Sequence, residues 1–144
     1  MTTEPTEQRA QSGRRRRATV PSEHAEQKAL FAWWRVQYKA LEPYLIAIPN
    51  GGARNLVTGA MLKAEGVRRG VPDVFLAYPS GGYHGLWIEM KRRAHGYASA
   101  EQKVMLAAFR RVGYDAAVCR GWDEAREKIQ SYLGAKARGN GSDV

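Results

Sequence analysis

Two carboxylates and a lysine have the residue types and the spacing of a site that could hydrolyse phosphodiesters. Glu89 and Lys91 lie two positions apart in the apolar run GLWIEMK, and Asp73 begins an earlier run, DVFLAY, after a Gly-Val-Pro lead. Side chains alternate across a β-strand, so Glu89 and Lys91 point to one face, whereas Met90 and its alternate apolar neighbours point to the other and are buried. In an antiparallel hairpin the start of one strand lies near the end of the next. We therefore expect Asp73 to lie beside Glu89 and Lys91.

Such a group of side chains suits a hard divalent cation. Mg²⁺ takes oxygen ligands, which are typically one or two carboxylates, water and substrate phosphates. The cation would polarise a phosphodiester and lower the pKa of a bound water, and Lys91 could orient that water or stabilise charge that develops on the phosphate. The alternative is a solvent-facing Glu–Lys pair on an edge strand. The Gly-Val-Pro-Asp lead and the hairpin spacing favour the site over that alternative.

A predicted helix over residues 22–40 supplies a fourth acidic candidate. Glu23 begins a stripe of residues, spaced three to four apart, that runs to Trp34 and faces the core, so its carboxylate can reach the sheet. An acid in the first turn also complements the helix dipole without any catalytic role. Glu26 lies on a neighbouring part of the helix and is the rival assignment. The residue types alone do not separate the two acids.

Gln102 has a structural explanation that competes with a functional one. Ser99-Ala100-Glu101-Gln102 is a capping-box sequence, in which the glutamine bonds back to the residue that caps the helix. A role in the site would require its amide to turn towards Lys91 instead. The histidines His24, His84 and His95 show no metal-ligand spacing, so they are interpreted as solvated or locally bonded side chains.

Basic residues surround the proposed site in the sequence. Two arginines precede Asp73, two follow Lys91, and an Asn-Gly-Gly run over residues 50–55 joins a predicted strand to a predicted helix. Glycines and amides can approach phosphates closely, although an ordinary Asn-Gly turn explains the same run equally well. The candidates for contact with DNA are Asn50, Arg54, Arg68, Arg69, Arg92 and Arg93.

The elements that must position these residues alternate between helix and strand. Periodicity and turn signals predict helices over residues 22–40, 56–65, 99–112 and 123–133, and strands over residues 44–48, 73–78, 85–91 and 114–119. Pro43 is expected to stop the first helix, and Gly113 stands where a helix commonly ends in glycine. This order predicts an α/β domain with a mixed sheet of about four strands and helices on its faces.

Charge and composition bound the function. The chain of 144 residues carries 23 Lys and Arg against 14 Asp and Glu, and this formal net charge of +9 indicates a polyanionic partner, with nucleic acid first. Residues 1–21 are predicted to be a flexible basic arm and residues 134–144 a loose tail, which leaves residues 22–133 as the folded domain. The single Cys119 excludes a disulfide scaffold or a Cys-based zinc site and fits a reducing cytoplasm. No apolar run is long enough to span a membrane, so we expect a cytoplasmic protein without a membrane partner.

These motifs in combination resemble a known family. The runs IPNGGARN, GVRRGVPDVFL and GLWIEMK, followed by SAEQ and GYDAAV, are similar to the virus-type replication-repair nuclease domain, VRR-NUC, of the PD-(D/E)xK nuclease superfamily. The resemblance covers roughly residues 22–133 and includes Pro-Asp at the second core strand, Glu-x-Lys at the third and a Ser-x-x-Gln helix start. It implies the restriction-endonuclease-like αβββαβ core of that superfamily. The basic arm lies outside the family core.

The resemblance also implies a metal-dependent DNA endonuclease. The family pattern places Asp73, Glu89, the backbone carbonyl of Met90 and Glu23 around Mg²⁺ or Mn²⁺, with Lys91 as the catalytic lysine and Gln102 beside them. Stand-alone members of phage and bacterial type resemble Holliday-junction resolvases, which act as homodimers on branched DNA in the host cytoplasm without an organic cofactor. Flap, nicking or restriction-like nucleases of the same fold are alternatives, and a non-catalytic nucleic-acid-binding module would need only basic charge and aromatic residues.

Overall fold

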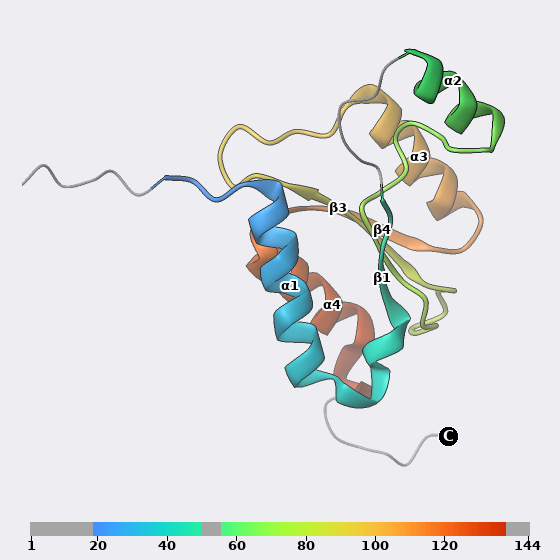
Figure 1. Ribbon diagram of the computed structural model, residues 1–144. Helices are drawn as coiled ribbons and strands as arrows, with labels where there is room; N and C mark the ends of the chain where they lie inside the picture. The colour runs from blue at the N-terminus through green and yellow to red at the C-terminus, as the bar shows by residue number, and fades with distance from the viewer. Residues whose placement is uncertain (1–18, 50–55, 138–144) are drawn as a thin grey trace, which may run out of the picture.

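The computed structural model describes residues 19–49 and 56–137, which form one sheet with helices on both faces (Figure 1). The sheet order is β1 (Leu45–Ala47), β2 (Val74–Leu76), β3 (Leu86–Lys91) and β4 (Asp115–Arg120). The first two pairs of neighbours are antiparallel, and β3 and β4 are parallel. The helices are α1 (Glu23–Gln37), α2 (Leu56–Ala64), α3 (Ala100–Arg111) and α4 (Gly121–Ala137), with a 3₁₀ segment, η1 (Lys39–Tyr44), after α1. The predicted α/β class with a mixed sheet of four strands is confirmed.

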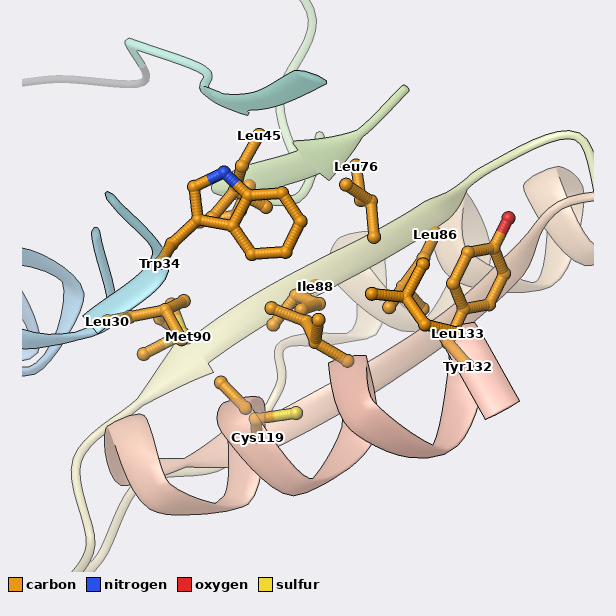
Figure 2. Close-up of a cluster of buried hydrophobic side chains, with 13 residues drawn as sticks. Leu30, Trp34, Leu45, Leu76, Leu86, Ile88, Met90, Cys119, Tyr132 and Leu133 are labelled. Atoms are coloured by element: carbon orange, nitrogen blue, oxygen red, sulfur yellow. The ribbon is translucent and has the colours of Figure 1, made fainter. Parts of the chain in front are cut away.

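One face of the sheet is covered by α1 and α4, and the main apolar core lies there (Figure 2). Leu30 and Trp34 of α1 pack into this core with Ile88 and Met90 of β3, and none of the four is more than 1% exposed. Burial of each large apolar side chain stabilises the fold by roughly 1.5–3 kcal/mol. The alternate residues of β3 that the sequence predicts to be buried are therefore buried, and Glu89 faces the other way.

The opposite face of the sheet is covered by α3. Trp87 of β3 stacks between Phe75 of β2 and Phe109 of α3, with ring centroids 4.2 Å and 4.5 Å apart. This aromatic stack clamps α3 onto the hairpin of β2 and β3. Because both faces of β3 are covered, Glu89, which lies on the α3 side, is only 2% exposed.

The helix ends differ from the sequence-based prediction in one informative place. α1 ends at Gln37 because Tyr38 leaves the helical conformation, with φ −124° and ψ 59°, and stacks its ring on Trp34 at a centroid distance of 4.7 Å. The prediction that Pro43 stops α1 is therefore wrong, and Pro43 lies inside η1. Gly113 follows α3 with φ 97°, as predicted for a glycine at a helix end. No helix within the described ranges has both the length and the apolar character needed to cross a membrane.

Candidate active site

The hairpin of β2 and β3 brings Asp73 to the end of β3. The antiparallel register pairs Val74 with Ile88, so its continuation by one residue sets Asp73 opposite Glu89. The Met90 N–H donates a hydrogen bond to Asp73 Oδ2 at 2.9 Å, and the Ile48 N–H donates one to the Asp73 carbonyl oxygen at 2.8 Å. The N–H and C=O of one residue in a regular strand face the same neighbouring strand, so the Met90 carbonyl is also on the side of Asp73. The Glu89 carboxylate and the Met90 carbonyl of β3 thus lie on the side of the Asp73 carboxylate.

The Gly-Val-Pro lead before Asp73 packs against the start of α3. Gly70 has φ 83°, and a Cβ at this position would lie 2.7 Å from the Glu101 carbonyl oxygen and 3.1 Å from the Gln102 nitrogen. Glycine alone suits both the left-handed backbone and this close approach. The lead therefore holds Asp73 in a set position relative to the first turn of α3, where Gln102 lies.

The two carboxylate oxygens of Glu89 have different surroundings. Oε1 accepts a hydrogen bond from Gln102 Nε2 at 2.8 Å and forms an ion pair with Lys91 Nζ at 3.4 Å. Oε2 is buried and has no hydrogen-bond partner among residues 19–49 and 56–137. A buried carboxylate oxygen without a partner is costly, because it has lost its hydration and gained nothing in exchange. The protein thus orients Glu89 through one oxygen and leaves the other available.

Burial of Glu89 raises its pKa from 4.5 to about 8, and the negative charge of Asp73 adds to this increase. The neighbouring Lys91 lowers the pKa of Glu89 again, but its single positive charge does not offset the other two effects. Two carboxylates and one ammonium group leave this site short of positive charge. The unpaired Oε2 beside Asp73 is therefore an environment that a divalent cation fits, because such an ion prefers carboxylate oxygens.

Gln102 both caps α3 and contacts the site. Its Oε1 accepts a hydrogen bond from the Ser99 N–H at 2.8 Å, which closes the predicted capping box, while its Nε2 donates to Glu89. From the sequence, capping and a role in the site are expected to compete, because a site role would turn the amide towards Lys91. That expectation is wrong. An amide has an acceptor at one end and a donor at the other, so one side chain fills both roles. The donor end reaches Glu89 rather than Lys91.

A cleft of about 1200 Å³ opens over these residues. Asp73, Glu89, Lys91 and Gln102 line it on the side of the sheet and α3, and Glu23 lines it at the start of α1. A second wall is formed by α2 and the segment that follows it. The residues of that wall are Gly59, Ala60, Leu62, Lys63, Gly66, Val67, Arg68, Arg69, Gly70 and Val71. The cleft therefore has an acidic floor and a basic wall.

The same part of the chain lies within a match to a known domain family. The profile of the VRR-NUC domain matches residues 11–123 of the 144. The chain belongs to the VRR-NUC family. A solved structure described as a VRR-NUC domain protein is 30% identical to this chain, has a TM-score of 0.71, and is matched over 80% of this chain and 90% of its own. No curated protein matches the sequence significantly. The family match begins inside the segment predicted as the basic arm and ends in the first turn of α4.

Within this VRR-NUC domain, Glu26 is engaged in holding loops together. It is 2% exposed, and it accepts hydrogen bonds from Arg93 Nε at 2.8 Å and from the Trp122 N–H at 2.7 Å. Arg93 also forms an ion pair with Asp123 at 2.8 Å. Both carboxylates hold the pKa of Arg93 above its ordinary value. Arg93, predicted to contact DNA, thus has its guanidinium occupied by Glu26 and Asp123.

Glu23 lies one turn before Glu26, at the N-terminal end of α1, and lines the cleft. No three His, Cys, Asp or Glu side chains within the described ranges are close enough together to hold one metal ion. Glu23 is therefore not grouped with Asp73 and Glu89 among the described residues, and its role as a direct ligand stays a prediction. Its place in the first turn of α1 is exposed, at the margin of the cleft rather than on the sheet.

The other predicted DNA contacts divide by position. Arg68 and Arg69 line the cleft. Arg92 is exposed in the loop after β3, outside the residues that line the cleft. Asn50 and Arg54 lie outside the described residues. Lys63 of α2 also lines the cleft. It is not among the DNA contacts predicted from the sequence, because nothing near it in the sequence indicates that α2 lies across from β3.

Substitution of the two first-helix acids should separate their roles. Glu26→Gln removes the negative charge that binds Arg93 and the Trp122 N–H, so we expect the free energy of unfolding to fall by about 2 kcal/mol. The loss is smaller than for a fully buried ion pair, because Arg93 is half exposed. Glu23→Gln, at an exposed position, should leave that free energy unchanged and lower DNA cleavage. Urea denaturation of both variants checks the first half, and cleavage assays on the folded proteins check the second. Equal stability of the two variants would contradict this division of roles.

Proposed function

We propose that this VRR-NUC domain is a divalent-cation-dependent DNA endonuclease that cuts branched DNA, four-way junctions included. The observation that carries the proposal is the Glu89 carboxylate, whose Oε1 is held by Gln102 and Lys91 while Oε2 is buried and unpaired among the described residues. Its position beside Asp73 suits Mg²⁺ or Mn²⁺. The net charge of +9 and the basic wall of the cleft suit a DNA substrate.

The proposed ligands are the carboxylates of Asp73 and Glu89 and the backbone carbonyl of Met90. A bound divalent cation supplies a Lewis acid that polarises the phosphodiester and lowers the pKa of water. Gln102 holds Oε1 of Glu89 in a hydrogen bond, so Oε2 is the oxygen that is left, in one orientation, to bind the ion. Glu23, at the margin of the cleft, is assigned to binding a water of the outer hydration shell rather than the ion.

Lys91 provides the positive charge on the reacting side of the site. Its Nζ is 3.4 Å from Glu89 Oε1, and its side chain is only 12% exposed, so the ammonium group is held near the carboxylates by the fold. An ammonium in this place can orient the attacking water and stabilise negative charge that develops on the phosphate. Lys63, Arg68 and Arg69 on the basic wall of the cleft would bind the neighbouring phosphates of the strand.

Lys91→Met should separate cutting from binding. We expect the cleavage rate to fall roughly 100- to 1000-fold, because a positioned charge is lost from the transition state. Affinity for uncut DNA in EDTA should change little, since one cation among many phosphate contacts is removed. Lys128→Met is the matched control, because Lys128 pairs with Asp115 at 2.9 Å at the other end of the sheet. A Lys91→Met protein that cuts at the wild-type rate would remove Lys91 from the mechanism.

A homodimer is part of the proposal for four-way junctions. Symmetric nicking of two strands requires two active sites, and each 16.1 kDa chain supplies one. Analytical ultracentrifugation of the protein with an uncut junction should show two chains per junction. A single chain per junction would restrict the enzyme to nicking one strand at a time.

The deciding experiment is a panel of DNA substrates. Four-way junction, flap, nicked and linear duplex DNA are each incubated with wild type and with Lys91→Met, in Mg²⁺ and in EDTA. The proposal expects cation-dependent cuts in the junction that Lys91→Met does not make. Cleavage confined to flaps, nicks or one duplex sequence would assign the same site to another nuclease activity. Binding of DNA without any cation-dependent cleavage would mean a nucleic-acid-binding module instead.

A further inference from the structure

We propose that Tyr97 and Arg120 form a binding site for an unpaired nucleobase directly beside Lys91. The inference rests on the proposed function, because it names the part of the DNA that lies next to the cleaved bond. Tyr97 belongs to the loop between β3 and α3, which projects past the end of the sheet close to the start of α1 (Figure 1). Neither Tyr97 nor Arg120 lines the cleft itself, so the pair extends the site beyond it.

The loop after β3 is folded back onto Lys91. A Cβ on Gly96 would lie 2.5 Å from the Arg92 carbonyl oxygen and 2.9 Å from Lys91 Cβ, so only glycine allows this approach. His95, just before it, has φ 60°, a left-handed conformation that non-glycine residues rarely adopt. Such a conformation persists where the surrounding structure enforces it. The residue that follows Gly96, Tyr97, is thereby held next to the end of β3.

Arg120 places the Tyr97 ring on the same face of the sheet as Lys91. The parallel register pairs Lys91 with Arg120, and paired residues on neighbouring strands project to one face about 4.8 Å apart. Arg120 Cζ lies 4.6 Å from the centre of the Tyr97 ring, which is a cation–π contact. Tyr97 is nevertheless 70% exposed. The ring is thus held by an arginine on one side and is accessible on the other.

A tyrosine ring supported in this way is a platform for a nucleobase. Any base can stack on an aromatic ring, so the contact needs no particular sequence. Bases inside a duplex are already stacked and must be extruded at a cost to reach the ring, whereas an unpaired base at a branch, flap or nick reaches it with little cost. The charge of Arg120 also attracts the adjoining phosphate. The pair therefore gives a preference for DNA with an unpaired nucleotide next to the scissile bond.

The test measures binding without cutting. Wild type, Tyr97→Ala, Tyr97→Phe and Tyr83→Ala are titrated in EDTA with a labelled junction that has an unpaired nucleotide at its branch, and with linear duplex of the same sequence. Loss of one stacked base should weaken the affinity of Tyr97→Ala for the branched DNA roughly tenfold and leave linear duplex unchanged. Tyr97→Phe should bind as wild type does. Tyr83 is a matched control, because it is 44% exposed and lies in the turn between β2 and β3, at the other end of β3.

A photocrosslink gives a second readout that a structural role would not change. With 5-iodouracil at the unpaired position, the crosslinked peptide of the wild type should contain Tyr97. A crosslink elsewhere, an unchanged affinity of Tyr97→Ala, or an equal loss on linear duplex would overturn the inference. None of these measurements needs cleavage. A wild type that cuts no DNA but shows the Tyr97-dependent preference would overturn only the proposed function, whereas cutting without that preference would overturn only this inference.

Discussion

Asp73→Asn will lower the rate of cation-dependent DNA cleavage at least roughly 100-fold without unfolding the domain. Asparagine keeps the shape of aspartate, and its amide oxygen can still accept the hydrogen bond that the Met90 N–H donates to Oδ2. The anchor between β2 and β3 is therefore retained. The negative charge is lost, and with it one of the two carboxylates proposed to bind the ion. Single-turnover cleavage of a junction, together with thermal denaturation, measures both effects.

Asp115→Asn is the matched control for this loss of charge. Asp115 begins β4 at the opposite end of the sheet from Lys91, where it pairs with Lys128. Its substitution should reduce stability slightly and leave the cleavage rate of the folded protein unchanged. A similar loss of cleavage in both variants would mean that the sheet as a whole, and not the Asp73 carboxylate, had been disturbed. Wild-type cleavage by Asp73→Asn would remove Asp73 from the proposed site.

The affinity for Mn²⁺ will rise about tenfold for each pH unit up to about pH 8 and level off above it. The pKa of Glu89 is raised to about 8 by burial and by Asp73, so the carboxyl group is protonated at neutral pH without an ion. A cation binds the carboxylate form and must displace this proton. Isothermal titration calorimetry in buffers of different ionisation enthalpy should detect the release of one proton per ion near pH 7. Glu89→Gln should bind weakly at every pH and release none.

The same raised pKa acts on stability in the absence of a cation. Between about pH 4.5 and pH 8 the folded protein keeps a proton on Glu89 that the unfolded chain has released. The contribution of this group to the free energy of unfolding therefore falls as the pH rises through that window. Urea denaturation of wild type and Glu89→Gln at both ends of the window should show this fall in the wild type only. A fall of equal size in both proteins would assign it to another group.

The centre of the site could be predicted because its geometry is local. In LWIEMK the alternation of a strand separates the buried apolar residues from Glu89 and Lys91, and a hairpin needs only a short turn to return Asp73 to the same end. The structure has this arrangement, with Asp73 bonded to the backbone of Met90. The capping box at Ser99 is equally local and is also present. Short-range patterns of this kind are readable because few other parts of the chain decide them.

The rest depends on partners that are distant in the sequence. Glu23 and Glu26 differ because Arg93 and Trp122, which are 67 and 96 residues from Glu26, bond to one acid and not the other. The end of α1 was misplaced because the stacking of Tyr38 on Trp34, and not Pro43, decides it. Lys63 was missed since only the packing of the tertiary structure brings α2 across from β3. No property of the residues themselves carries this information.

The double contact of Gln102 restricts which residue the start of α3 can use. A capping box can be closed by glutamate as well as by glutamine, since either side chain offers an oxygen to the backbone N–H of the cap. Here the far end of the side chain must also donate to Glu89 Oε1. Glutamate would cap the helix equally well but would place a third carboxylate against Glu89 and Asp73. Glutamate and glutamine would both cap the helix, but only glutamine also suits the contact with Glu89 on the neighbouring strand.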